Sequence, residues 1–192
     1  MNWGIFTFVV VGIIIVILAL IWILNARRLD RLHRTVIQSR LTLNEALAHR
    51  ATIASDFAAS EALDVAGAIL LAEASQVALG QTHTPLSEDG LEDGPGHRRQ
   101  SRHYADDRSV VESNLSRTLR LVLDGLELSE LDEWQRGRYD LLQEARDDVK
   151  LARRFHNAFV DQARRLRSNW FVRALRMAGG APMPQPVDMD DE

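Results

Sequence analysis

The chain opens with an unbroken run of apolar side chains. No ionisable side chain occurs between Met1 and Arg27, and Trp3 to Leu24 is a run of 22 residues dominated by Ile, Val, Leu and Phe. As a helix rising about 1.5 Å per residue, this run spans about 33 Å, enough to cross a hydrocarbon core of about 30 Å. Residues 1–26 are therefore predicted to be a short outer tail followed by a single transmembrane helix.

The flanks of this run indicate how it sits in a membrane. Trp3 and Trp22 lie near its two ends, where amphipathic rings prefer the interface, and Arg27 and Arg28 follow it directly. The positive-inside rule predicts an inner cell membrane protein with its N-terminus outside and its remaining residues in the cytoplasm. A cleaved signal peptide is the alternative, but it needs a basic start and a shorter apolar stretch, so we expect a retained anchor.

The next residues change to a helical pattern with one apolar face. From Asn25 to Ser55 there is no Pro or Gly, and apolar residues recur at helical spacing: Leu29, Leu32, Val36, Leu43 and Leu47. A turn is expected between residues 55 and 65, where Ser and Asp residues can cap a helix. An Ala- and Leu-rich helix over 65–79 is expected to stop at Gly80. Residues 27–79 are thus predicted to hold the first two bundle helices.

A polar stretch interrupts the pattern at residues 80–104. It contains four Gly, two Pro, an acidic cluster and then a basic cluster, with almost nothing that could enter a core. The composition predicts a disordered loop. A regulatory role, with Thr84 before Pro85 as a phosphorylation site, is weighed against a tolerated insertion, which the pattern favours.

Helical periodicity returns in residues 105–178. A third helix is expected from about Asp106 to Gly125, and Ser129 to Asp132 matches a capping box that would start the fourth helix. The fourth helix should run to about Met177 on this apolar stripe: Leu141, Ala145, Val149, Ala152, Phe155, Phe159, Ala163, Leu166 and Trp170. Residues 179–192 are expected to be an acidic disordered tail. The fold class predicted is all-α, a single N-terminal transmembrane helix followed by an antiparallel bundle of about four helices.

Charge is segregated along the chain although the formal net charge is only −4. Residues 149–176 carry eight basic residues and one acidic residue. In an antiparallel bundle, this basic end of the last helix returns towards the bilayer, where an anionic leaflet attracts it. The candidate membrane-surface contacts are Arg164, Arg165, Arg167, Trp170, Phe171, Arg173 and Arg176. An ordinary solvated helix face with two core aromatics is weighed evenly against this, and nucleic acid is disfavoured because the domain is acidic and tethered.

The sequence contains few residues in patterns typical of catalytic, metal-binding or cofactor-binding sites. It contains no cysteine, which excludes disulfides, thiolate metal sites and cysteine nucleophiles. Phosphate-binding, dinucleotide-binding and metalloprotease motifs are absent, and no two of the six His residues share helical spacing. His156 is expected to be a partly buried, hydrogen-bonded structural residue. We therefore predict no catalytic residue, no metal, no cofactor and no small-molecule substrate.

Two segments carry a family resemblance. Leu151 to Asp161, with the sequence Leu-Ala-Arg-Arg-Phe-His-Asn-Ala-Phe-Val-Asp, resembles the last-helix motif of the LemA family of bacterial membrane proteins. Leu43 to Arg50 is similar to that family's first cytoplasmic helix, and His156 stands where the family usually has Tyr. The resemblance implies an N-terminal membrane helix and a cytoplasmic helical bundle, in a family with no established catalytic activity.

The function predicted is a membrane-anchored cytoplasmic scaffold or interaction module without catalytic activity. Its expected partners are the lipid bilayer and a protein partner or second copy of the chain, and Arg153, Arg154 and Asn157 are the candidate interaction residues. On the plainer interpretation these three are solvated helix surface. A membrane-tethered signal transducer and a hidden helical-bundle enzyme remain as alternatives.

Overall fold

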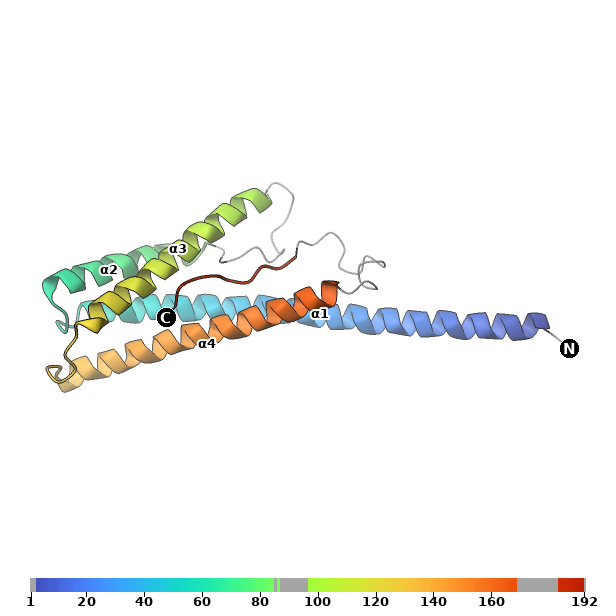
Figure 1. The fold of residues 1–192 in the computed structure, drawn as a ribbon, viewed down its shortest axis with the longest axis horizontal. Helices are drawn as coiled ribbons and strands as arrows, with labels where there is room; N and C mark the ends of the chain where they lie inside the picture. Colours follow the sequence, from blue (N-terminus) through green and yellow to red (C-terminus); the bar gives the residue numbers. More distant parts are fainter. Residues whose placement is uncertain (1–2, 85, 87–96, 169–182, 192) are drawn as a thin grey trace.

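Four helices make up the chain in this computed structural model, which describes residues 3–84, 86, 97–168 and 183–191 (Figure 1). They are α1 (Trp3–Ala58), α2 (Val65–Gly80), α3 (His97–Asp124) and α4 (Glu133–Ser168). No strand occurs in the described ranges. The predicted all-α class, with one long N-terminal helix and a bundle, is confirmed.

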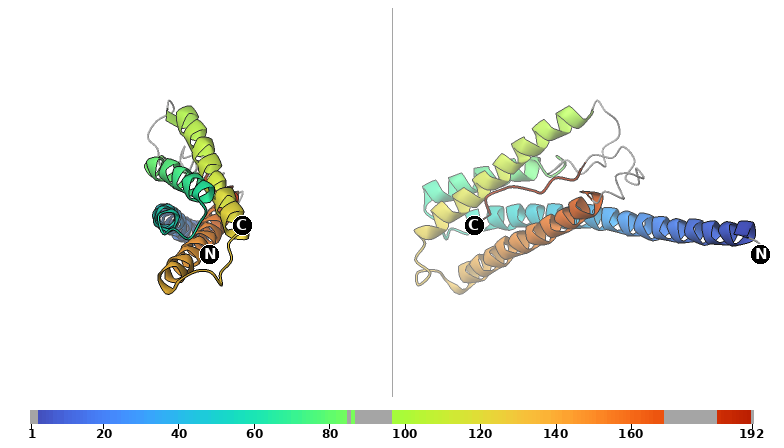
Figure 2. Two further views of the ribbon diagram at one scale, coloured as in Figure 1. Left: turned by 90° about the vertical axis from the view of Figure 1, so that its left-hand side faces the viewer. Right: turned by 45° about the vertical axis from the view of Figure 1, so that its right-hand side comes forward.

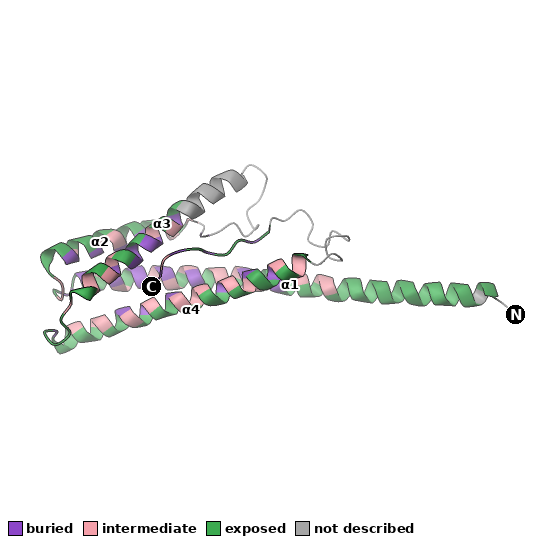
Figure 3. Cartoon of the chain, in the orientation of Figure 1, coloured by how far each residue is buried: buried purple, intermediate pink, exposed green. Residues whose placement is uncertain are grey.

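Helix α1 is a single unbroken helix of 56 residues. Its first half extends beyond the other helices, and the side chains described between Trp3 and Leu24 are exposed (Figures 2 and 3). The Thr7 hydroxyl donates to the Trp3 carbonyl at 2.8 Å, so the one polar side chain near its start is satisfied within the helix. This helix is long and apolar enough to cross a membrane.

The second half of α1 is the centre of the bundle. It packs directly against α4 and α2, and α2 in turn packs against α3. The largest core cluster takes buried residues from every helix, among them Phe57, Leu71, Leu119 and Leu142. Another cluster, nearer the apolar half of α1, pairs Val36 of α1 with Val160 of α4. Val36 of α1 thus packs beside the later part of α4, whereas Phe57 shares a cluster with Leu142 near the start of α4. The two helices therefore run antiparallel, as predicted.

The turn before α4 is capped differently from the prediction. The Asp132 carboxylate accepts from the Gln135 backbone N–H at 2.7 Å, and the Gln135 side chain accepts from the Asp132 N–H at 3.1 Å. These reciprocal bonds form a capping box over Asp132 and Gln135, so α4 begins at Glu133 and the Ser129 box is wrong. Asp64 caps α2 as expected, accepting from Gly67 N–H at 3.0 Å.

Two predicted disordered segments differ from the structure. Helix α3 begins at His97, inside the expected 80–104 loop, because residues 97–105 contain no Gly or Pro to stop it. Leu86, in the same predicted loop, is only 4% exposed. Residues 183–191, expected to be part of a disordered tail, lie as an extended segment between α3 and α4 (Figure 1). We call residues 183–191 the strap.

The buried face of α4 agrees with the predicted stripe at Ala145, Val149 and Ala163 and differs from it at the other described positions. Its buried residues are Leu142, Ala145, Val149, His156, Val160 and Ala163. Leu141 and Phe155, which the stripe placed in the core, are exposed. His156 therefore occupies the core position that the pattern assigned to Phe155.

Candidate functional site

The strap-binding site lies between α3 and α4, over α1. It consists of the residues of these helices that contact the strap: Leu43, Leu47, Ser109, Ser113, Arg117, Arg120, Val149, Arg153, Asn157 and Arg164. Helices α3 and α4 are not among the helix pairs that pack extensively against each other. The strap contacts both of them and therefore bridges them. An extended segment seated between helices makes this the most specific site in the described part of the chain.

Backbone contacts hold the strap in an extended form. The Asn157 side chain donates from Nδ2 to the Val187 carbonyl at 3.0 Å and accepts from the Val187 N–H at 2.9 Å. On the opposite side, the Ser113 hydroxyl accepts from the Asp190 N–H at 3.0 Å, and the Ser109 hydroxyl donates to the Asp188 carbonyl. Three polar side chains from two helices thus act on the strap's main chain.

Two arginines form ion pairs with the acidic end of the strap. Arg153 donates from Nε and Nη2 to the two Asp191 carboxylate oxygens at 2.6 and 2.7 Å. Arg120 donates from Nη1 and Nη2 to the two Asp190 oxygens at 2.7 and 2.6 Å, with Arg117 at 3.6 Å. Such two-pronged guanidinium–carboxylate pairs are the strongest and most directional of ion pairs.

Apolar side chains of the strap fill the space between these polar contacts. Val187 is 2% exposed and Met189 is 6% exposed. Both belong to a core cluster with Leu43 and Leu47 of α1 and Val149 of α4. The strap therefore completes the hydrophobic core on this side of the bundle.

A cluster of buried charges lies in the same region of the bundle. Arg50 donates from Nη2 to Glu112 Oε2 at 2.9 Å and from Nη1 to Ser116 Oγ at 2.8 Å. Arg108 lies 3.6 Å from the other Glu112 oxygen, and all three charged side chains are at most 2% exposed. Arg108 also donates to the carbonyls of Thr82 and Thr84, which ties the segment after α2 to α3.

This cluster has more positive than negative charge. Desolvation by burial lowers the pKa of Arg50 and of Arg108, and the Glu112 carboxylate opposes both shifts. Two cations face one anion, and the Arg50 Nε and Arg108 Nε and Nη2 groups are buried without a hydrogen-bond partner among the described residues. The charge of Asp191 also favours protonated Arg50, so the strap's last described residue contributes to balancing the cluster.

His156 is fully buried on α4 and faces α1. Its Nδ1 lies 3.0 Å from the Ser39 hydroxyl, and its Nε2 has no partner among the described atoms. Desolvation and the positive charge of Arg40 lower the pKa of His156 to about 4. The ring is therefore neutral near pH 7. The predicted hydrogen bond is present, and the side chain is buried more deeply than expected.

The structure separates the three candidate interaction residues. Arg153 and Asn157 meet at the strap, whereas Arg154 is exposed and makes no contact with it. Sequence reasoning missed Arg50, Arg108 and Glu112. A usable signal was present, since Arg50 follows Leu43 and Leu47 at core spacing, and Arg108 and Glu112 precede Leu115 and Leu119 in the same way.

An open pocket lies where α4 reaches the base of the apolar helix. This open pocket of about 540 Å³ is lined by Arg28, Ala158, Phe159, Gln162, Arg165 and Leu166. The basic end of α4 thus lies beside the first cations that follow the apolar run.

The predicted membrane-surface and anchor residues are placed as follows. Arg164 contacts Gln185 of the strap, and Arg167 is half-buried. Trp170, Phe171, Arg173 and Arg176 lie outside the described residues. Trp3 and Trp22 are exposed near the two ends of the apolar stretch, and Arg27 is exposed with Arg28.

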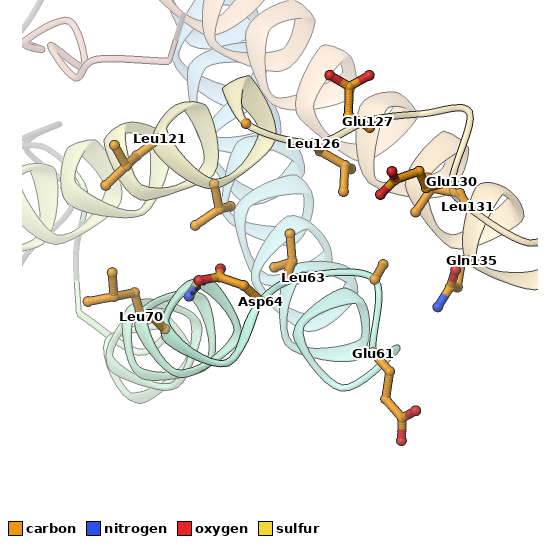
Figure 4. Close-up of a pocket in the computed structure, with 15 residues that line it drawn as sticks. Glu61, Leu63, Asp64, Leu70, Leu121, Leu126, Glu127, Glu130, Leu131 and Gln135 are labelled. Atoms are coloured by element: carbon orange, nitrogen blue, oxygen red, sulfur yellow. Dashed lines mark hydrogen bonds between the residues drawn. The ribbon is translucent and has the colours of Figure 1, made fainter.

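Another pocket lies at the opposite end of the bundle, among the turns (Figure 4). It has a volume of about 680 Å³ and is lined by Leu side chains and by four carboxylates, from Glu61, Asp64, Glu127 and Glu130. Glu61 points away from the others. Within the described ranges, no group of three or more His, Asp or Glu residues is placed to hold a metal ion.

Comparison with known proteins gives no relative. No family model matches the chain, and no curated protein or solved structure shows significant similarity to it.

Proposed function

We propose that the protein is a single-pass, membrane-anchored interaction module of the LemA-like type, without catalytic activity, whose bundle lies at the cytoplasmic face of an inner membrane. The observation that carries the proposal is the division of α1 into two halves. One half is an exposed apolar helix, and the other half organises the bundle without a break between them. A module built this way is held at a fixed orientation to the bilayer.

The antiparallel return of α4 supports the same arrangement. Arg165 of α4 and Arg28 of α1 line one pocket, so two basic segments meet at the level where the apolar helix ends. Cations at this level favour the cytoplasmic leaflet, by about 1 kcal/mol for each well-placed basic residue. The strap-binding site begins at this basic end, where Arg164 contacts Gln185, and its acidic end lies further along the bundle at Arg153 and Arg120.

The absence of native cysteine makes the orientation directly testable. Asn2→Cys and Leu128→Cys would be labelled with a membrane-impermeant maleimide in intact cells. We expect labelling of the first variant from outside, and labelling of the second only after permeabilisation. The reverse pattern, or release of the chain from membranes by alkaline carbonate, would contradict the proposal.

The interaction role is tested with a photo-crosslinking residue at Arg154, which is exposed and lies in the segment that resembles the LemA last-helix motif. In intact membranes we expect a discrete crosslinked protein from this position. The matched control is the same probe at exposed Glu144 on the same helix. Equal crosslinking from both positions would show that the Arg154 face is not a specific surface.

Lipid contact at the basic end of α4 is part of the proposal and has its own test. The full chain is reconstituted in nanodiscs with or without anionic lipid, with a fluorophore on Arg165→Cys or on Leu128→Cys. We expect the first fluorophore alone to respond to the change in lipid charge. A response from neither position would show that α4 stays clear of the surface.

A relay of conformational change is the second candidate, favoured by the continuity of α1. Inserting one Ala after Arg28 rotates the apolar half by about 100° relative to the bundle. A relay predicts that the distance between spin labels at Leu121→Cys and Asp188→Cys shifts on insertion. An inert tether predicts an unchanged distance.

A further inference from the structure

The strap is bound as a separate peptide would be. Buried and exposed residues alternate over 186–189, since Val187 and Met189 are buried while Pro186 and Asp188 are exposed, and the buried Asp191 continues this pattern. Asp190 is partly buried because Arg120 binds it from α3. Period-two alternation is the pattern of an extended chain seated on one face. Recognition through main-chain hydrogen bonds plus pockets for alternate side chains is a general mode of peptide binding.

The contacts select a definite chemistry. The Asn157, Ser109 and Ser113 contacts reach main-chain atoms, so they accept any extended chain. The apolar cluster of Leu43, Leu47 and Val149 selects two apolar residues spaced by two, and the forks of Arg120 and Arg153 select two consecutive carboxylates. The pattern that fits is apolar, any, apolar, acidic, acidic.

The buried charge cluster beside the site carries excess positive charge, and the charge of Asp191 acts on its Arg50. Even with the strap seated, Arg50 and Arg108 share one carboxylate and have buried N–H groups without partners among the described residues. Without Asp190 and Asp191, the site would present Arg120 and Arg153 with no carboxylate of the strap to bind. Charge complementarity therefore points to an acidic occupant rather than to a neutral or basic one.

We propose that this site recognises extended acidic segments of that pattern, and that the strap occupies it in cis until an equivalent segment of a partner protein replaces it. The covalent connection from Ser168 to the strap spans residues 169–182, which include Gly179, Gly180 and Pro182. Such a connection holds the strap at a high but finite effective concentration, against which a partner segment competes. The inference rests on the proposed interaction role and names the partner chemistry for it.

The test uses a fluorescent peptide of residues 183–192 and the chain in nanodiscs, intact or ending at Pro182. We expect the shortened chain to bind the peptide at least about tenfold more tightly than the intact chain, because the cis strap competes. Equal affinity for both chains, or no binding to the shortened chain, overturns the proposal. Circular dichroism checks that the shortened chain keeps its helices, and if it does not, an intact chain carrying Asp190→Asn and Asp191→Asn in its own strap takes its place.

Peptide variants test the proposed sequence pattern without altering the protein. Asp191→Asn in the peptide should weaken binding by about tenfold or more, since a hydrogen-bonded charge pair is lost. Asp188→Asn is the matched control, because it removes the same charge from an exposed side chain. Equal losses from both peptides would mean that only overall charge is read, which overturns the proposed pattern.

On the protein, Arg153 and Arg154 form a matched pair of neighbouring arginines. Arg153→Gln should weaken peptide binding by about tenfold, while Arg154→Gln should leave it unchanged apart from a small salt-dependent effect.

The identity of the occupant is tested by light scattering of the intact chain. Concentration-dependent dimers that vanish on removal of the strap would make a second copy the occupant and overturn the partner assignment. A chain that is oriented as proposed in the membrane but binds no peptide would contradict this inference alone.

Discussion

The two halves of α1 share one backbone conformation and differ in everything else. From Trp3 to Leu24 the helix is apolar on all sides and exposed, whereas from Leu32 to Ala58 it buries one face and even encloses a charge at Arg50. An all-round apolar helix suits a lipid environment, while a one-sided stripe suits a protein core. Helix formation alone therefore says little about environment, and the distribution of side chains around the helix decides it.

The largest expected effect comes from disrupting the buried charge cluster that Arg50, in the bundle half of α1, forms with Glu112 and Arg108. Glu112→Gln leaves Arg50 and Arg108 buried without a carboxylate, and removal of one partner from a buried ion pair costs about 3–5 kcal/mol of stability. Urea denaturation in detergent micelles, followed by helicity, measures this loss. Replacing all three charged residues with Met or Leu of similar volume should recover much of the stability, and a destabilisation as large as that of the single variant would contradict this reading.

A pair of Phe→Ala substitutions sharpens the comparison between the halves. Phe57 is 0% exposed in the core and Phe8 is 81% exposed in the apolar half. Phe57→Ala should cost the bundle about 4 kcal/mol by leaving a cavity, while Phe8→Ala should leave bundle stability unchanged. The same denaturation experiment measures both variants. Similar losses would show that the apolar half is part of one cooperative folding unit with the bundle.

Acid should weaken the junction between the bundle half of α1 and α4. Because the pKa of His156 is lowered to about 4, the unfolded chain binds a proton at higher pH than the folded chain does. The contribution of neutral His156 is complete above about pH 6.5 and falls as the pH is lowered towards 4, by about 3 kcal/mol in all. The measurement is stability against pH for the native chain and for His156→Gln. If both lose stability in parallel over this range, other groups are responsible.

The smallest effect concerns the exposed surface of α4. Lys150 donates to Asp147 at 3.2 Å in a pair that is largely exposed, and such pairs contribute about 0.3–0.5 kcal/mol. Lys150→Ala should therefore change the denaturation midpoint only slightly, and less still at high salt. A loss above about 1 kcal/mol would indicate a role that the exposed geometry does not explain.

The sequence by itself was sufficient for the architecture. The uninterrupted apolar run, the spacing of Leu32, Val36, Leu43 and Leu47 by one or two helical turns, and the Gly80 stop predicted the apolar first helix, the bundle and the antiparallel return. These features are local, because amphipathic periodicity and caps act within a few turns of helix. Membrane orientation, partners and family stay predictions.

Only the tertiary structure decided the strap-binding site. Residues 183–191 carry too few apolar side chains to order themselves, so composition predicted disorder, and their order comes from Asn157, Arg120 and Arg153 on two distant helices. The burial of Arg50, and of His156 in place of Phe155, likewise depends on which helices meet there. Contacts between residues far apart in the chain have no local signature, which is why the motif residues were found in the sequence but their ligand was not.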